Sequence, residues 1–295
     1  MELEISAGAG IKGELRTLHA DAQQRAVTEH ILALADQAGY GAALIDTVAL
    51  GHAEAAVITW PQFAHMVRAA ARGLSRRGLQ PGDTAGIFVG DAVSHVVAVH
   101  AVRAAGGMAA AVRPTRSAAD IGAQLKQGRA RLLITSAGLA DLGIQAAERS
   151  WVRQVFAFGE AEGTTPFDSL VQTPRHRQPQ ANGTSGHSDG PAPEQIFDLA
   201  ELGLELGADR VAPQLIRRPV PRLTCRDVVV AAPPCGDPEA YTSLLDLALA
   251  AGATVVAAPR DQVTAALGGY KGTAAIVPRG TDVPGLPAGR ILAVS

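Results

Sequence analysis

Short apolar runs alternate with amphipathic, helix-like segments from about Val27 onward, and this alternation constrains the fold more than any other feature of the chain. The segment "TWPQFAHMVRAAARGLSRRGL" carries its apolar side chains on one stripe at helical spacing, and Thr59 and Gln62 are placed to form a capping box at its start. The turn "QPGD" and the apolar run "IFV" follow. We therefore expect a helix, a turn and then a buried strand.

The same alternation continues on both sides of a polar stretch. The helical pattern "HVVAVHAVRAAGG" precedes the strand pattern "MAAAVRP", and "SAADIGAQLKQGRA", with Ser117 at its N-cap, precedes "RLLITS". Further along, "DVVVAAPP", "YTSLLDLALAAG", "ATVVAAP", "AAIVP" and "ILAVS" repeat the pattern. Alternation of this kind is typical of parallel strands joined by crossover helices. The sequence predicts an α/β fold built from two parallel-type βαβ units.

Composition changes between the two units. The stretch "QTPRHRQPQANGTSGHSDGPAPEQ" has almost no large apolar residue and is rich in Pro, Gly, Ser and Gln, which indicates an exposed linker. We divide the chain into an N-terminal extension over 1–26, a first α/β subdomain over 27–170, a linker over 171–194 and a partial second α/β subdomain over 195–295.

Charge and cysteine usage narrow the classes of function. Lysine plus arginine is 26 and aspartate plus glutamate is 28, with no block of like charge, so we expect neither a nucleic acid nor a membrane surface as partner. The start "MELEISAGAG" is acidic, and the longest apolar stretch is interrupted by Asp246, so we expect a cytoplasmic protein without a membrane span. Cys225 and Cys235 lack metal-binding spacing, and we expect no metal site.

Several motifs, in this order, resemble the N-terminal domain of the adenylate-forming (ANL) superfamily, which includes acyl-CoA synthetases and 4-coumarate-CoA ligases. "ITWPQF" is similar to the family's "ITYxEL", "GLSRRGLQPGDTAG" to "GLxxxGVxPGDxVA", and "ARLLITS" to "ARLLVT". "CRDVVVAAPP" and "LALAAGATVVAAPR" are similar to "DDVVLxxLP" and "LLAGATVVLxPR". The resemblance extends from about Val27 to Arg260 and implies the fold of that N-terminal domain.

The resemblance also places the family's phosphate loop, SGTTGxPKG, on the linker. The matching residues are Asn182, Gly183, Thr184, Ser185, Gly186, His187, Ser188, Asp189 and Gly190. In the family, the loop's amides and hydroxyls hold the ATP phosphates and its lysine adds positive charge. Asp189 stands at the lysine position, and like charges ~4 Å apart at an effective dielectric of ~20 repel by roughly 4 kcal/mol. We expect this degenerate loop to bind neither ATP nor its Mg²⁺, so no cofactor is expected.

Other departures from the family pattern point the same way. The segment "LPLFH", which helps to line the family's acyl pocket, reads "APPCGD" here, with Cys235 and Gly236 as the remnant of that pocket. The sequence ends at "GRILAVS", before the family's adenine loop, its "YGxTE" and "TGD" segments and its C-terminal lysine, so no residue takes a catalytic role. The resemblance therefore implies a truncated ligase-like pseudoenzyme.

Two other interpretations of single motifs remain weaker. "GHSDG" fits the G-x-S-x-G pattern of hydrolases, but no buried strand precedes it and no histidine follows His187, so the triad order cannot be met. A simple polar linker explains the segment better. His65, His95 and His100 are expected to be ordinary surface or core histidines, and Cys235 an inert thiol.

Two functions are compatible with these observations. The first is a binding or accessory protein that takes an acyl ligand and docks on a full-length ligase, on a carrier protein or on a second copy of itself as a homodimer. The alternative is an enzyme that performs a partial ligase or acyl-transfer reaction on a pre-activated acyl group. We expect self-association through the C-terminal half, because its apolar pieces would leave a sheet edge without a neighbour.

Overall fold

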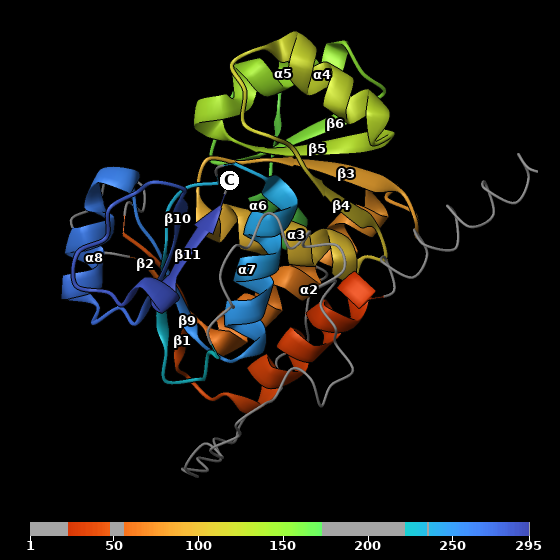
Figure 1. Cartoon of the computed structure of the whole chain (residues 1–295). Coiled ribbons are helices and arrows are strands. Elements are labelled where there is room, and N and C mark those ends of the chain that lie inside the picture. Colours follow the sequence, from red (N-terminus) through yellow and green to blue (C-terminus); the bar gives the residue numbers. More distant parts are fainter. Residues whose placement is uncertain (1–22, 48–55, 173–221, 235, 295) are drawn as a thin grey trace, which may run out of the picture.

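Two β-sheets organise the molecule. The computed structural model describes residues 23–47, 56–172, 222–234 and 236–294. One sheet has six strands in the order β11-β10-β8-β9-β1-β2, and the other has five in the order β4-β3-β5-β6-β7. Figure 1 shows the two sheets in different layers, with helices between them and on their outer sides. The predicted α/β class with parallel units is therefore confirmed.

The five-stranded sheet is entirely parallel. Its strands are β3 (Thr84–Phe88), β4 (Met108–Ala111), β5 (Ala130–Ser136), β6 (Gln154–Phe158) and β7 (Thr165–Pro166). Every residue of β3 is buried. A strand that is buried on both faces reads as a continuous apolar run, which is why "IFV" stands out in the sequence.

The six-stranded sheet combines strands from both ends of the described chain. Its strands are β1 (Ala42–Asp46), β2 (Ala56–Thr59), β8 (Val228–Ala231), β9 (Thr254–Ala257), β10 (Ala274–Pro278) and β11 (Ile291–Val294). All neighbours are parallel except β1 and β2, which are antiparallel. β1 pairs with β9, and Leu44 lies opposite Val255.

The predicted domain bounds can be compared with this pairing only in part, because 1–22 and 173–221 lie outside the described residues. Within the described residues, β1 and β2 lie in the predicted first subdomain but complete the sheet of the second. The backbone groups along β9 require a partner strand, and β1 supplies it.

Helices form three further layers. They are α2 (Trp60–Arg76), α3 (Ala92–Ala104), α4 (Ala118–Gln127), α5 (Ala140–Glu148), α6 (Asp168–Val171), α7 (Pro238–Ala250), α8 (Val263–Gly269) and a helix over residues 23–37. Helices α2, α3 and α7 lie between the sheets, α4 and α5 cover the outer side of the five-stranded sheet, and α8 covers the other sheet (Figure 1).

The start of α2 shows how local sequence sets an element. The backbone amide of Gln62 donates to Thr59 Oγ1 at 3.4 Å, and the amide of Thr59 donates to Gln62 Oε1 at 2.8 Å, so the predicted capping box is confirmed. The N-cap role predicted for Ser117 is also confirmed, since its hydroxyl accepts from the amide of Asp120 at 3.2 Å.

Helix α3 is buried on almost all sides, because it contacts both sheets as well as α2 and α7. Its aliphatic residues belong to the largest apolar cluster of the described residues. Its position in the interior also buries polar side chains of this helix, among them His95, His100 and Arg103. Buried polar groups of this kind need internal partners.

Candidate functional site

An apolar pocket of about 360 Å³ lies where β3 and β4 end, and we name it the edge pocket. It is lined by Ile87, Phe88, Val89, Gly90, His95, Val112, Pro114, Thr115, Arg116, Leu139, Leu142, Pro234 and Pro238. Ligands of open α/β sheets bind outside the carboxyl ends of parallel strands, in cavities of roughly 300–1,000 Å³. Position and volume make this the candidate functional site.

The first wall is the turn from β3 into α3. The amide of Gly90 donates to Ser136 Oγ at 3.0 Å, which ties the end of β3 to the end of β5. The Asp91 carboxylate then caps α3 by accepting from the amide of Ser94 at 2.6 Å. Burial raises the pKa of Asp91, although the hydrogen bonds from Ser94 oppose the shift.

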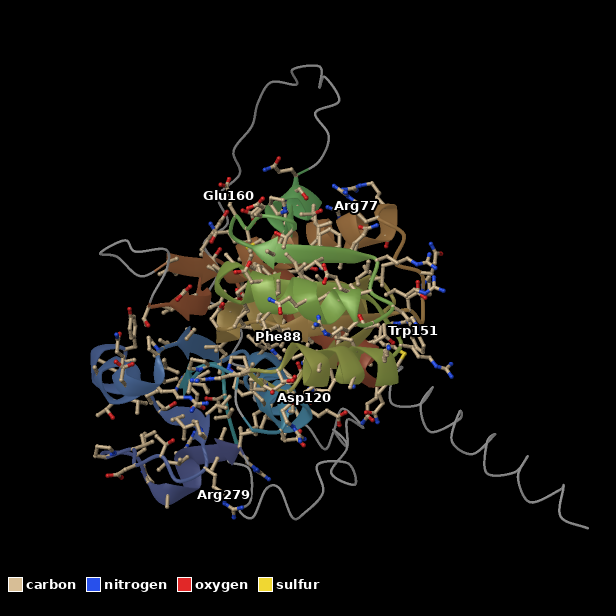
Figure 2. The ribbon with its side chains drawn as sticks, turned by 90° about the horizontal axis from the view of Figure 1, so that it is seen from above. Arg77, Phe88, Asp120, Trp151, Glu160 and Arg279 are labelled. Carbon is tan, nitrogen blue, oxygen red and sulfur yellow. The ribbon has the colours of Figure 1, made fainter. Side chains whose placement is uncertain are left out.

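Figure 2 helps to locate this wall. Phe88 lies near the middle of the view, between the green helices and the blue C-terminal elements. Trp151, which precedes β6 and is 58% exposed, lies toward the right of the view, away from the blue elements. The pocket is at the carboxyl end of the five-stranded sheet because Phe88 is the last residue of β3, and the segment after β8 of the other sheet reaches it through Pro234.

The second wall comes from the segment between β8 and α7. Pro234 follows β8, and Pro238 opens α7, whose N-cap residue Asp237 accepts from the amides of Glu239 and Ala240 at 2.9 Å each. Gly236 lies between the two lining prolines and has a φ of +61°, in the left-handed region that favours glycine. Residues from both sheets thus meet at one pocket.

The predicted site residues can be placed only in part. Asn182, Gly183, Thr184, Ser185, Gly186, Asp189 and Gly190, the predicted phosphate loop, lie outside the described residues, as does Cys235. Gly236, the other predicted remnant of the acyl pocket, is described and lies beside the pocket wall without lining it. The roles of these residues stay predictions.

His95 lines the pocket as a neutral side chain. Burial lowers its pKa to about 3, against the opposing attraction of Asp246. The hydroxyl of Thr242 donates to the carbonyl of Pro238 at 2.7 Å, so the 2.8 Å contact between His95 Nε2 and that hydroxyl must use a proton on Nε2. The ring offers no positive charge to a ligand at neutral pH.

Arg116 carries the charge of the site. Among the described lining residues it is the only one that is ionised at neutral pH, and its side chain is exposed at the rim. An apolar cavity with one guanidinium at its mouth suits a ligand with an apolar body and an anionic end.

The part of the chain that the structure describes contains no group of three His, Cys, Asp or Glu residues placed to hold a metal ion. The same residues include no helix that is both long and apolar enough to cross a membrane.

A buried ionic cluster lies between α3 and α7, away from the residues that line the edge pocket, and was not predicted. Arg103 Nη1 donates to Asp246 Oδ2 at 2.8 Å, and His100 Nε2 lies 3.5 Å from Asp246 Oδ1. Thr28 Oγ1 is 2.9 Å from His100 Nδ1. Burial lowers the pKa of His100 to about 4, and this effect outweighs the nearby carboxylate, so the ring is neutral and the ion pair is that of Arg103 with Asp246.

The positions of the histidines agree with their expected ordinary roles. His95 and His100 are buried with partners inside the protein, and His65 is exposed on α2. The signal for the missed cluster was present in the sequence, because Arg103 and Asp246 are each a charged residue inside an otherwise apolar helical pattern.

Comparison with known proteins gives a match to a sequence family and matches to solved structures. The sequence profile of the family described as AMP-binding enzyme matches residues 36–196. No curated protein matches the chain.

Solved structures with the same fold include acyl-activating enzymes. A long-chain-fatty-acid-CoA ligase from Archaeoglobus fulgidus matches with a TM-score of 0.62 and 18% identity over 85% of this chain and 51% of its own. A benzoate CoA ligase from Burkholderia xenovorans LB400 matches with a TM-score of 0.61 and 22% identity, over 90% of this chain and 54% of its own. The amide bond synthetase McbA from Marinactinospora thermotolerans matches with a TM-score of 0.58 and 18% identity, over 86% of this chain and 48% of its own. The chain spans about half the length of these proteins, and at such identities the likeness concerns the fold.

Proposed function

Because the chain belongs to the AMP-binding enzyme family, we propose that this acyl-CoA ligase-like protein binds a carboxylic acid or acyl group in the edge pocket without adenylating it. Its role is that of a binding or accessory protein in acyl activation. Two features support this proposal: the character of the pocket and the residue at the lysine position of the phosphate loop.

The pocket suits an apolar acyl or aryl group. The apolar walls include Phe88, Val112 and Leu142. The cavity volume of about 360 Å³ accommodates a small ring or a short chain. A carboxylate at the mouth would lie within reach of Arg116, whose planar guanidinium binds carboxylates through two parallel hydrogen bonds. His95, neutral and engaged with Thr242, would face the apolar part of the ligand.

Asp189 is the observation that carries the loss of adenylation. In the resemblance it takes the place of the lysine that attracts the ATP phosphates. Repulsion of roughly 4 kcal/mol at ~4 Å corresponds to a loss of about a thousandfold in affinity relative to an uncharged residue, and the loss relative to lysine is larger still. Because adenylation depends on positioning and on charge stabilisation, weak binding of the triphosphate removes the reaction.

Pyrophosphate exchange with a panel of aliphatic and aromatic acids tests the loss of adenylation. We expect no exchange above a control without protein. In parallel, Asp189→Lys should strengthen ATP binding measured by calorimetry, and Asp189→Asn should give an intermediate affinity. Exchange by the native chain clearly above the control would refute the proposal.

A partial acyl-transfer reaction is the second candidate, and the meeting of both sheets at the edge pocket favours it. Under this alternative the protein would consume a pre-activated acyl group, either an acyl-adenylate or a CoA thioester. Incubation with benzoyl-CoA or benzoyl-adenylate, with water as the acyl acceptor, distinguishes the two. Release of benzoate together with CoA or AMP above the rate without protein supports transfer, and an unchanged rate supports binding alone.

The expected protein partners, namely a second copy, a full-length ligase or a carrier protein, remain proposals, as does the cytoplasmic location. The strand β11 is at one edge of the six-stranded sheet as described, and an edge strand offers backbone groups for pairing.

A further inference from the structure

A second, larger cleft of about 740 Å³ lies between the helix over residues 23–37, α2 and the end of α3. It shares no lining residue with the edge pocket. Gly90 and His95, near the start of α3, line the edge pocket, whereas Ala104 and Ala105, at the end of α3, line this cleft. The two cavities therefore lie at opposite ends of a helix about 20 Å long.

Four arginines line this cleft, and we name it the arginine cleft. They are Arg25, Arg68, Arg72 and Arg76, and Glu29 is the one acidic residue among the described lining residues. The last three are spaced at i, i+4 and i+8 on α2, so their side chains project from one face of the helix. Like charges at this spacing disfavour the helix, and the protein as a whole has a formal net charge of −2. The positive cleft is therefore not a consequence of the overall charge.

Intramolecular partners neutralise only part of this charge. Arg68 is paired with Asp36 through two bonds of 2.7 Å, which lowers the pKa of Asp36. Arg25 donates to the carbonyl of Gly106 at 3.2 Å, a neutral partner that leaves the charge of the guanidinium in place. Arg72 and Arg76 have no ion-pair partner among the described residues.

The other walls of the cleft leave room around the guanidinium groups. Ala71, Ala104 and Ala105 are small, and the hydroxyl of Ser75 donates to the carbonyl of Ala71 at 3.1 Å. The carbonyls at the end of α3 carry partial negative charge, which opposes an anion on that side. The guanidinium of Arg25 is held at the carbonyl of Gly106, just beyond that end of α3, so an anion is best accommodated on the α2 side, near Arg72 and Arg76.

We propose that the arginine cleft binds a small molecule that carries two or more phosphoryl charges. Guanidinium groups bind phosphate oxygens through paired hydrogen bonds, and Arg25, Arg72 and Arg76 provide such groups from two different helices. The volume exceeds that needed for one phosphate and falls within the range of small-molecule sites. A concave site of this size fits a compact ligand better than it fits a flat membrane surface. The proposal does not depend on the function proposed for the edge pocket.

Calorimetric titration of the full chain with inorganic pyrophosphate tests the site. We expect saturable binding by the native chain and at least about tenfold weaker binding by Arg72→Ala/Arg76→Ala. The matched control is Arg149→Ala/Arg153→Ala, which removes two exposed arginines outside the cleft and should bind as the native chain does. Benzoate binding at the edge pocket should be the same in both double variants. A failure to bind pyrophosphate at the arginine cleft can therefore be distinguished from a failure to bind an acid at the edge pocket.

Three outcomes would overturn the proposal. They are no pyrophosphate binding by the native chain at millimolar concentration, equal binding by the Arg72/Arg76 variant, or equal weakening by the control variant. A short poly-glutamate peptide that binds the cleft more tightly than pyrophosphate and a nucleoside diphosphate would also refute it, because the natural partner would then be an acidic peptide. Comparison of pyrophosphate with the nucleoside diphosphate shows whether a free or an esterified diphosphate is preferred.

Discussion

At the residue scale, Asp246 is the centre of the buried ionic cluster between α3 and α7. Asp246→Ala leaves the guanidinium of Arg103 buried without a counter-charge, since the two are now 2.8 Å apart. Loss of one partner of a buried pair costs about 3–5 kcal/mol. We expect a decrease of this size in the free energy of unfolding, measured with urea.

Two further variants complete this experiment. Asp261→Ala, at an exposed position, should change stability by no more than about 0.5 kcal/mol. The double variant Arg103→Met/Asp246→Leu should be more stable than Asp246→Ala, because it removes both charges and keeps apolar volume. A double variant as unstable as the single one would contradict this account.

The two buried histidines predict how stability depends on pH. Burial lowers the pKa of His95 to about 3 and that of His100 to about 4, whereas both titrate near 6.5 in the unfolded chain. Between these values the unfolded state binds more protons than the folded state. Their contribution is therefore complete above about pH 6.5 and is lost as pH falls toward 4, by up to about 1.4 kcal/mol per pH unit for each histidine.

Urea unfolding at pH 7, 6, 5 and 4.5 measures this slope. His100→Gln and His95→Gln should each reduce the slope of the free energy of unfolding against pH by an amount that corresponds to about one bound proton, whatever they do to stability at pH 7. A native chain whose stability is constant from pH 7 to 5 would show that these rings titrate in the folded state as they do in the unfolded state.

Binding of a carboxylate at the edge pocket is expected to depend on Arg116. Arg116→Ala should weaken benzoate binding by about tenfold or more, since hydrogen bonds to a charged group contribute about 1.5–3 kcal/mol. Arg113→Ala is the matched control, an exposed arginine in the same segment that does not line the pocket. Equal affinities of the two variants would place the carboxylate elsewhere.

At the scale of elements, the contact of α2 with α6 requires a glycine. A Cβ added at Gly73 would lie 2.4 Å from the carbonyl oxygen of Leu170 and 2.7 Å from its Cα. Both are backbone atoms, which cannot move away cheaply. Although alanine favours a helix by about 1 kcal/mol over glycine, we expect Gly73→Ala to destabilise the protein by about 1–3 kcal/mol.

Gly268 in α8 is the control for Gly73, because an added Cβ there meets nothing within 4 Å. Gly268→Ala should leave stability unchanged or raise it by up to about 1 kcal/mol. Thermal unfolding of the two variants separates the effect of packing from that of helix propensity, and similar melting temperatures would refute the close-packing argument.

At the scale of the whole molecule, the edge of the six-stranded sheet is the predicted surface for self-association. Within the described residues β11 pairs only with β10, and Ala293 on β11 is exposed. We expect light scattering over a micromolar range to detect a dimer. Ala293→Lys should shift the equilibrium toward monomer, because a charge on an edge strand opposes pairing. A native chain that is monomeric throughout would refute this prediction.

The sequence by itself determined many of the elements and their order, although it gave no prediction for strands such as β1 and β6 or for helix α5. The capping box of Thr59 with Gln62, the N-cap at Ser117 and the apolar run of β3 all depend on contacts within a few residues, and the structure confirms them. Local hydrogen bonds and periodicity can be identified without the rest of the chain. The alternation of these elements was sufficient to predict the α/β class.

Only the tertiary structure decided which distant residues meet. It paired β1 with β9, joined Arg103 to Asp246 across 143 positions, and placed Phe88 and Pro234 in one pocket. It also brought Arg25 beside the arginines of α2. Each side chain has many compatible partners along the chain, and the choice among them follows from how sheets and helices pack as a whole, which no local pattern contains.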